Sequence, residues 1–277
     1  MHRTTGTRAV RRLVLGGASL ALAATMVACG SDDSGGDDTT AAGTSTAEKS
    51  ADPTDFCEAS VDLEAAFAMG PAVDDAAPPE DQQAALEEFS ATVEPLLGEV
   101  EDAAPEEISG TVTDATGIVR EALSGGDPST LEGPEFQQAD DDIDEYMLAE
   151  CGYEQLEATG VDYEYEGIPE TVPAGVVAVT FTNAGTETHE LGIVRINDDV
   201  TQPVEELLTL PEEEVFSKVT FTGISFAEPG ETDTTFLRME KGRYGAACFI
   251  PQGSLAEVQG AGPPHFTLGM FTEFAAE

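Results

Sequence analysis

Cysteine is the residue type whose number and spacing say most about chemistry in this sequence. The chain of 277 residues has four cysteines, Cys29, Cys57, Cys151 and Cys248, and three histidines. A thiol can carry a lipid, form a disulfide or bind a soft metal as the thiolate. The compartment of the protein, and the elements that carry each cysteine, decide among these roles.

The N-terminus predicts export from the cytoplasm. Residues 1–12 contain four arginines and no acid, and residues 13–28 are apolar or small throughout. This is the pattern of a signal peptide. The Arg11-Arg12 pair leaves the export route, Sec or twin-arginine, open. The apolar run is too short and too rich in small residues for a membrane span of about twenty strongly apolar residues. We therefore expect residues 1–28 to be removed.

The end of the apolar run resembles the bacterial lipobox. Small residues precede Cys29 and Gly30 follows it, although Met26 is a less usual residue at the first lipobox position. The resemblance implies that Cys29 becomes the lipidated N-terminus and anchors the protein on the outer face of the cell membrane. The alternative is a chance cysteine at an ordinary cleavage site. Residues 29–52 are acidic and rich in Gly, Ser and Thr, which predicts a flexible tether.

The charge of the chain excludes one class of partner. The sequence has 55 acidic and 11 basic residues, and cleavage would remove four arginines and no acid. A surface this negative excludes nucleic acid as a partner. The excess of acidic residues is explained by solubility outside the cell. It is also compatible with a negative electrostatic field that concentrates cations and steers a basic protein partner.

Residues 53–157 are predicted to be helical. Four segments carry apolar residues at helical spacing, and each opens with a proline, which is favoured in the first turn: Pro53, Pro79, Pro105 and Pro134. Short connections between four helices predict an antiparallel bundle. In such a bundle the first helix begins where the fourth ends, so we expect Cys57 and Cys151 to form a disulfide. A reactive or metal-binding role for this pair is disfavoured, because no histidine lies between residues 53 and 160.

An acidic run within the last predicted helix raises the question of calcium. Asp140, Asp141 and Asp142 are consecutive, and Asp144 and Glu145 follow closely. The run lacks the alternating ligands and central glycine of an EF-hand loop. We therefore expect a solvated helix face.

Residues 161–277 are predicted to form a β-sandwich. Segments with strand character alternate with turn signals, at 176–182, 191–196, 219–221, 234–237, 244–250 and 266–274. A short helix is expected at residues 203–208. About 115 residues of this character are typical of two packed sheets.

Short motifs in this region resemble the cupredoxins. In chain order they are residues 179–185 followed by His189, then Glu228-Pro229-Gly230, then Gly242-Arg243-Tyr244 leading to Cys248, then Pro264-His265 and Gly269-Met270. Each motif is weak alone, and their order is specific. The resemblance implies a two-domain α + β chain, in which an antiparallel helical bundle precedes a cupredoxin-like Greek-key β-sandwich.

The same resemblance implies a type 1 copper site with ligands His189, Cys248, His265 and Met270. Two imidazoles and a thiolate, with a weak axial thioether, hold Cu(I) and Cu(II) in similar geometry. Cys248 is also the one thiol left without another role once Cys29 is lipidated and Cys57 is paired. The alternatives without a metal are that Cys248 is an inert buried thiol, that His189 and His265 are ordinary strand-end and loop residues, and that Met270 belongs to the core. A multicopper oxidase is excluded, because the chain has no second His-Cys set.

Two features depart from the family pattern. Residues 249–264 separate Cys248 from His265, where family members have only a few residues. We expect this insert to loop outward while Ile250-Pro251 and Pro263-Pro264 hold its ends near the site. Glu190 replaces an asparagine that commonly ties the ligand loops together, so we expect this tie to be lost.

Three functions remain open from the sequence. The first is single-electron transfer by a membrane-tethered monomer to a basic redox protein, with His265 as the exit edge. The second is copper scavenging, buffering or delivery to an oxidase, and the third is a metal-free interaction module on the same scaffold. No constellation of catalytic residues stands out, so we do not expect an enzyme.

Overall fold

The computed structural model describes residues 53–71, 78–125, 130–131, 133–256 and 258–277. The predicted signal peptide, the Cys29 anchor and the tether lie outside the described residues. Within the described part of the chain, no helix is both long and apolar enough to cross a membrane.

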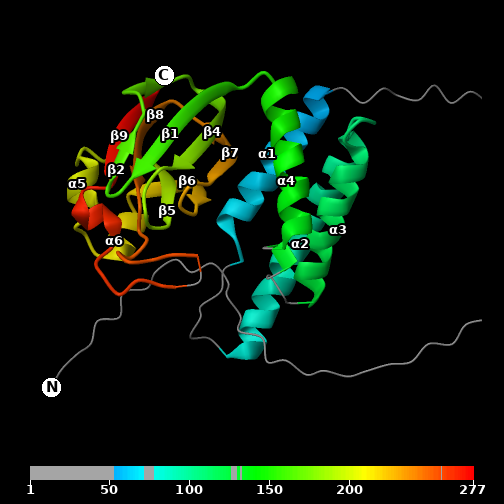
Figure 1. The fold of residues 1–277 in the computed structure, drawn as a ribbon, viewed down its shortest axis with the longest axis horizontal. Coiled ribbons are helices and arrows are strands. Elements are labelled where there is room, and N and C mark those ends of the chain that lie inside the picture. Colours follow the sequence, from blue (N-terminus) through cyan, green and yellow to red (C-terminus); the bar gives the residue numbers. More distant parts are fainter. Residues whose placement is uncertain (1–52, 72–77, 126–129, 132, 257) are drawn as a thin grey trace, which may run out of the picture.

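Four helices form the N-terminal part of the molecule (Figure 1). They are α1 Pro53–Met69, α2 Pro79–Ala103, α3 Ser109–Gly125 and α4 Pro134–Glu150. Three begin at the predicted proline. The third begins later, because the carbonyl of Pro105 accepts hydrogen bonds from the N–H groups of Ile108 and Ser109 in a turn that precedes α3. Successive helices pack against each other in chain order.

The predicted disulfide between Cys57 and Cys151 is present. Their Cα atoms lie 5.7 Å apart, and the bond joins α1 to the residue that follows α4. The phenol of Tyr153 donates a hydrogen bond of 2.9 Å to the carbonyl of Cys57. The start of α1 is therefore fixed to the point where the chain leaves the helices and enters the sheets.

Nine strands follow and form two sheets. The strands are β1 Glu154–Val161, β2 Glu164–Glu166, β3 Thr171–Val172, β4 Gly175–Asn183, β5 His189–Ile196, β6 Val219–Ala227, β7 Thr232–Met239, β8 Gly242–Ala247 and β9 Phe271–Ala276. One sheet has the order β2-β1-β4-β7, and the other has the order β3-β9-β8-β5-β6. The chain passes between the sheets after β2, β3, β4, β6 and β7. Two short helices, α5 Val204–Leu207 and α6 Glu212–Phe216, lie between β5 and β6; only the first was predicted.

The sheet region begins at β1, before the predicted boundary at residue 161. In β1 the side chains of Leu156 and Ala158 are buried and alternate with more exposed neighbours. The strand pairs in parallel with β4. The alternation is carried by small residues, so the hydrophobic signal in the sequence is weak.

The described residues contain three hydrophobic clusters, and two of them determine how the sheets and the helices pack. The first lies between the sheets and contains apolar residues from both, including Val179, Phe181, Ile193 and Phe274. The second lies between the helices and the outer face of the four-stranded sheet, and its buried members are Phe56, Val61, Val100, Ile108, Val112, Met147, Ala178 and Phe236. Because the helices share this core with β4 and β7, a separate helical bundle is not confirmed. The helices instead cover one face of the sandwich.

Candidate metal centre

Three of the predicted ligands meet at one end of the sandwich. His189 is the first residue of β5, Cys248 follows β8, and His265 begins the 3₁₀ helix η2 (His265–Leu268) that precedes β9. One ligand atom from each lies within 4.8 Å of the others, and no other such group of His, Cys, Asp or Glu occurs among the described residues. All three side chains are 0% exposed.

The ligand atoms face one another. The Nδ1 atoms of His189 and His265 are 3.0 Å apart, and the Sγ atom of Cys248 is 3.4 Å from Nδ1 of His265. Metal bonds of about 2.0–2.3 Å, as zinc makes to these atom types, span ligand pairs at such separations. Two imidazoles and one thiol are the donor set of a type 1 copper site.

Met270 is tied to the same loop by its backbone. Its N–H donates to the carbonyl of His265 at 3.2 Å, and its carbonyl accepts from the N–H of Cys248 at 3.1 Å. Gly269, with φ of 118°, adopts a left-handed conformation that favours glycine and turns the chain from η2 into β9. The side chain of Met270 is fully buried. Its sequence-predicted role as the axial ligand stays a prediction.

Each histidine is held at its far nitrogen by a carboxylate. Nε2 of His189 lies 3.3 Å from Oδ1 of Asp162, in the β1–β2 turn, and Nε2 of His265 lies 3.0 Å from Oε2 of Glu187, in the β4–β5 loop. Burial lowers the pKa of both imidazoles, against the effect of these carboxylates, which raises it. A neutral imidazole that donates Nε2–H to a carboxylate presents a bare lone pair at Nδ1.

The sequence analysis missed both carboxylates. Asp162 and Glu187 are far apart in the chain and are two among 55 acidic residues, so nothing in their spacing marks them. One signal was available in the Asn-Ala-Gly turn before His189. A Cβ atom on Gly185 would lie 2.6 Å from both Oδ1 of Asp162 and Nε2 of His189, so only glycine leaves room for this pair.

The thiol of Cys248 is held away from solvent. Burial, and then the charge of Glu190, raise the pKa of this thiol to about 12, against backbone hydrogen bonds that lower it. Cys248 is a free cysteine in the structure. A metal ion must therefore displace the thiol proton to gain a thiolate ligand.

The insert between Cys248 and His265 is closed at both ends, as predicted. Pro251 and Pro264 form an isolated antiparallel bridge. The N–H of His265 donates to the carbonyl of Ile250 at 2.9 Å, and the N–H of Phe266 donates to the carbonyl of Cys248 at 2.8 Å. The two ligands thus stay adjacent, whatever the length of chain between them.

The expectation for Glu190 was wrong. Its Oε1 atom accepts a hydrogen bond of 2.8 Å from the N–H of Phe249, so it ties β5 to the residue next to Cys248. A carboxylate oxygen accepts this bond as well as an amide oxygen would. The substitution of asparagine by glutamate therefore preserves the link between the ligand loops.

His265 was expected to be the edge through which electrons leave, and its side chain is completely buried. The ring of Tyr163 packs edge-on against it, with centroids 5.1 Å apart. Two apolar side chains near this loop are exposed: Phe249 is 43% exposed and Leu268 is 40% exposed. The ring of Phe249 contacts that of Phe266 at a centroid distance of 5.0 Å.

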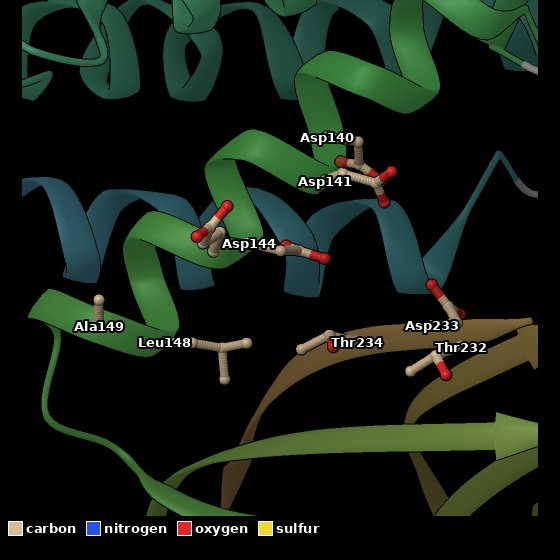
Figure 2. Close-up of a pocket in the computed structure, with 9 residues that line it drawn as sticks. Asp140, Asp141, Asp144, Leu148, Ala149, Thr232, Asp233 and Thr234 are labelled. Atoms are coloured by element: carbon tan, nitrogen blue, oxygen red, sulfur yellow. The ribbon is translucent and has the colours of Figure 1, made fainter.

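A cavity lies away from the His-Cys-His cluster, between α4 and β7. It has a volume of about 470 Å³, and Asp140, Asp144 and Asp233 are among its lining residues. Figure 2 shows Asp144 on the side of α4 that faces β7. Asp141 and Asp142 are exposed, as predicted for a solvated face, whereas Asp144 is half-buried.

Comparisons with known proteins were made for the whole chain. No family model and no curated protein matches it. Similar solved structures include reduced auracyanin from Roseiflexus castenholzii, with 20% identity over 44% of this chain and 96% of that one, and a TM-score of 0.30. Auracyanin A from Chloroflexus aurantiacus, described as a blue copper protein, has 17% identity over 46% of this chain and all of that one, with a TM-score of 0.30. Rusticyanin from Thiobacillus ferrooxidans has 17% identity over 44% of this chain and 76% of that one, with a TM-score of 0.30.

The class of the site follows from its own geometry. The sheet region is a sandwich of two sheets, with one histidine at the start of β5 and a cysteine and a second histidine around the β8–β9 connection. This is the arrangement that the resemblance of the sequence motifs to the cupredoxins implied. The buried His-Cys-His cluster fits a single type 1 copper site.

Proposed function

We propose that this protein binds one copper ion through His189, Cys248 and His265, with Met270 as the axial ligand, and carries single electrons. The observation that carries the proposal is the pair of Nδ1 atoms 3.0 Å apart in a fully buried site. When bound, copper supplies a one-electron couple between Cu(II) and Cu(I).

The two Nδ1 atoms make a metal-free site unfavourable. If both Nε2–H groups donate to their carboxylates, two lone pairs face each other at Nδ1, and the thiol of Cys248 can donate to that of His265 but leaves that of His189 without a donor. If one imidazole shifts its proton to Nδ1, a lone pair faces a carboxylate instead. An unsatisfied buried acceptor costs about 1–3 kcal/mol. A cation among the three ligand atoms removes this conflict, which argues against a metal-free interaction module.

Rigid ligand loops support electron transfer. A one-electron carrier works best when its ligands move little between the two oxidation states. The insert is bridged at Pro251 and Pro264, and Glu190 fixes Phe249, so the loop that carries Cys248 is restrained on both sides. A loose insert between Cys248 and His265 would have favoured copper storage over fast electron transfer, and these restraints argue against it.

The surroundings of the site suit an electron carrier. The apolar side chains of Phe249 and Leu268 are exposed beside the ligand loop, and would replace a bare imidazole edge as the point of contact. The acidic surface suits a basic one-electron redox protein. The lipid on Cys29 and the tether of residues 29–52 would keep a monomeric carrier at the outer face of the membrane, within reach of membrane-bound donors and acceptors.

Copper loading of the chain from Ser31 onward tests the proposal. We expect one Cu(II) per chain and an intense thiolate-to-copper charge-transfer band in the visible spectrum. Cys248→Ser removes the band, whereas Met270→Leu keeps it and changes the midpoint potential, since the axial ligand tunes the potential. A matched Met69→Leu change at an exposed helix end should alter neither. If wild-type protein gives no band, the copper function is wrong; a band without reversible voltammetry would favour storage or delivery.

A further inference from the structure

We propose that Asp162 and Glu187 are positioning residues that bias the bound metal toward Cu(II) and so set a low reduction potential. This inference rests on the proposed copper function and adds a determinant of the potential outside the ligands. The carboxylates come from two different loops, and each contacts one ligand histidine at the nitrogen that faces away from the cluster.

Both carboxylates are themselves fixed. Asp162 accepts bonds of 2.8 Å at Oδ1 from the N–H of Thr186 and at Oδ2 from its hydroxyl. Glu187 accepts a bond of 3.0 Å at Oε1 from the hydroxyl of Tyr163, and the N–H of Gly253 donates to its Oε2. A carboxylate with this many donors stays in place and holds its imidazole in one tautomer.

Hydrogen-bond donors surround both carboxylates. Asp162 faces the N–H and the hydroxyl of Thr186 as well as His189, and Glu187 faces the hydroxyl of Tyr163 and the N–H of Gly253 as well as His265. Donors of this kind favour the charged form of a carboxyl group. Each of the two imidazoles therefore has a negative charge at its Nε2 side.

Negative charge next to the imidazoles acts differently on the two oxidation states. A carboxylate that accepts Nε2–H makes Nδ1 a stronger donor, and the ion with the higher charge gains more from a stronger donor and from nearby anions. The oxidised state is therefore stabilised relative to the reduced state. The protein would yield its electron more readily than a site whose histidines contact neutral groups.

The two residues should differ in strength. The side chain of Glu187 is 18% exposed and that of Asp162 is 37% exposed. Water and salt screen an exposed charge more than a buried one. We therefore expect the larger effect from Glu187.

Glu187→Gln and Asp162→Asn separate charge from shape. In each variant the amide oxygen can still accept Nε2–H, and the amide nitrogen then faces a hydroxyl, of Tyr163 or Thr186, which can turn to accept. A purely structural role would leave the potential unchanged. Removal of the charge should instead raise the ratio of Cu(I) to Cu(II) at fixed potential at least tenfold for Glu187→Gln, which is 59 mV for a one-electron couple.

The experiment is a spectroelectrochemical titration of copper-loaded chains from Ser31 onward. Glu231→Gln is the charge control, because Glu231 is exposed and its carbonyl accepts the N–H of Asn183 near the same loop. We expect the highest midpoint potential for Glu187→Gln and a smaller rise for Asp162→Asn. The control should have the midpoint potential of the wild type. A normal visible band with unchanged midpoints in both variants overturns the inference and leaves the copper function standing. Absence of the band in the wild type overturns both.

A metal-free readout covers the case in which a variant fails to load copper. Long-range ¹H–¹⁵N spectra of the imidazoles in the apo wild-type protein report the tautomer directly. At least one of the two rings should be locked with its proton on Nε2, and Glu187→Leu should release His265 from that state while Glu187→Gln keeps it. Freely exchanging tautomers in the wild type would contradict positioning by Asp162 and Glu187.

Discussion

The carboxylate of Glu190 accepts a hydrogen bond from the backbone N–H of Phe249, with Oε1 and N 2.8 Å apart. Glu190 follows His189 in β5, and Phe249 follows Cys248 after β8. One hydrogen bond therefore joins the residues next to two ligands. The carbonyl of Glu190 also accepts a bond from the hydroxyl of Tyr165. The position of the thiol thus depends on a side chain outside the predicted ligand set.

Glu190→Ala should weaken this link. The variant leaves the N–H of Phe249 without its acceptor, which costs about 1–3 kcal/mol of unfolding free energy. Copper binding should weaken as well, because Cys248 loses its restraint. Glu190→Gln keeps an acceptor and should behave nearly as the wild type. Urea unfolding and copper titration measure both effects, with the exposed Glu166→Ala as control; equal stability of the Ala and Gln variants would refute the role.

Gly185→Ala should damage the site by contact alone. The new methyl group would lie 2.6 Å from Oδ1 of Asp162 and from Nε2 of His189, so the pair must separate. Disturbing an outer partner of a metal-bound histidine typically costs 10–100-fold in metal affinity. Competition with a copper chelator measures this loss.

Gly117→Ala is the matched control for that change. Gly117 lies within α3, and a Cβ atom there meets nothing within 4 Å. The variant should keep full copper affinity and gain up to about 1 kcal/mol of stability, because alanine favours helix over glycine. Equal copper affinity of the two glycine variants would contradict the contact argument.

Stability should fall as pH rises through neutrality, because acids face each other between α1, α4 and β7. Burial raises the pKa of Glu64 to about 7, against the hydrogen bonds that its carboxylate accepts from Thr235 and Phe236. Burial, together with the charges of Asp140, Glu64 and Asp233, raises the pKa of Asp144 to about 9. Each folded-state pKa exceeds the unfolded value. The contribution of each group to the free energy of unfolding is therefore complete below about pH 4. It is lost between that pH and the folded-state pKa, at up to about 1.4 kcal/mol per pH unit for each group.

Urea midpoints between pH 5 and 9 test this dependence. The double variant Glu64→Gln, Asp144→Asn should show a shallower fall with pH than the wild type. Asp142→Asn, an exposed position of the same helix that does not line the cavity, should keep the wild-type slope. A slope that the double variant leaves unchanged would assign the pH dependence to general repulsion within an acidic chain.

Loss of the disulfide should destabilise the fold and leave the metal site intact. Cys57 and Cys151 are 94 residues apart in sequence. The chain-entropy model assigns about 4.7 kcal/mol to closing a loop of that length. The Cys57→Ser, Cys151→Ser variant should unfold at lower urea concentration and still give the wild-type copper spectrum while folded. A lost spectrum in folded protein would show that the helices and the site are coupled.

Patterns in the sequence predicted much of the fold and three of the residues that cluster. Helical periodicity after Pro53, Pro79 and Pro134 located three helix starts, and the bundle hypothesis paired the cysteines correctly. The cluster of His189, Cys248 and His265 was predicted from the resemblance of their ordered motifs to the cupredoxins, because no local signal brings residues so far apart in the chain together.

The tertiary structure decided what depends on distant segments. The helices share a core with β4 and β7, since Ala178 and Phe236 present apolar side chains on the outer face of the sheet. Asp162 and Glu187 become partners of the histidines only when two loops meet at one end of the sandwich. In a chain with 55 acids, no local pattern distinguishes these two carboxylates, because their role comes from position and burial and not from residue type.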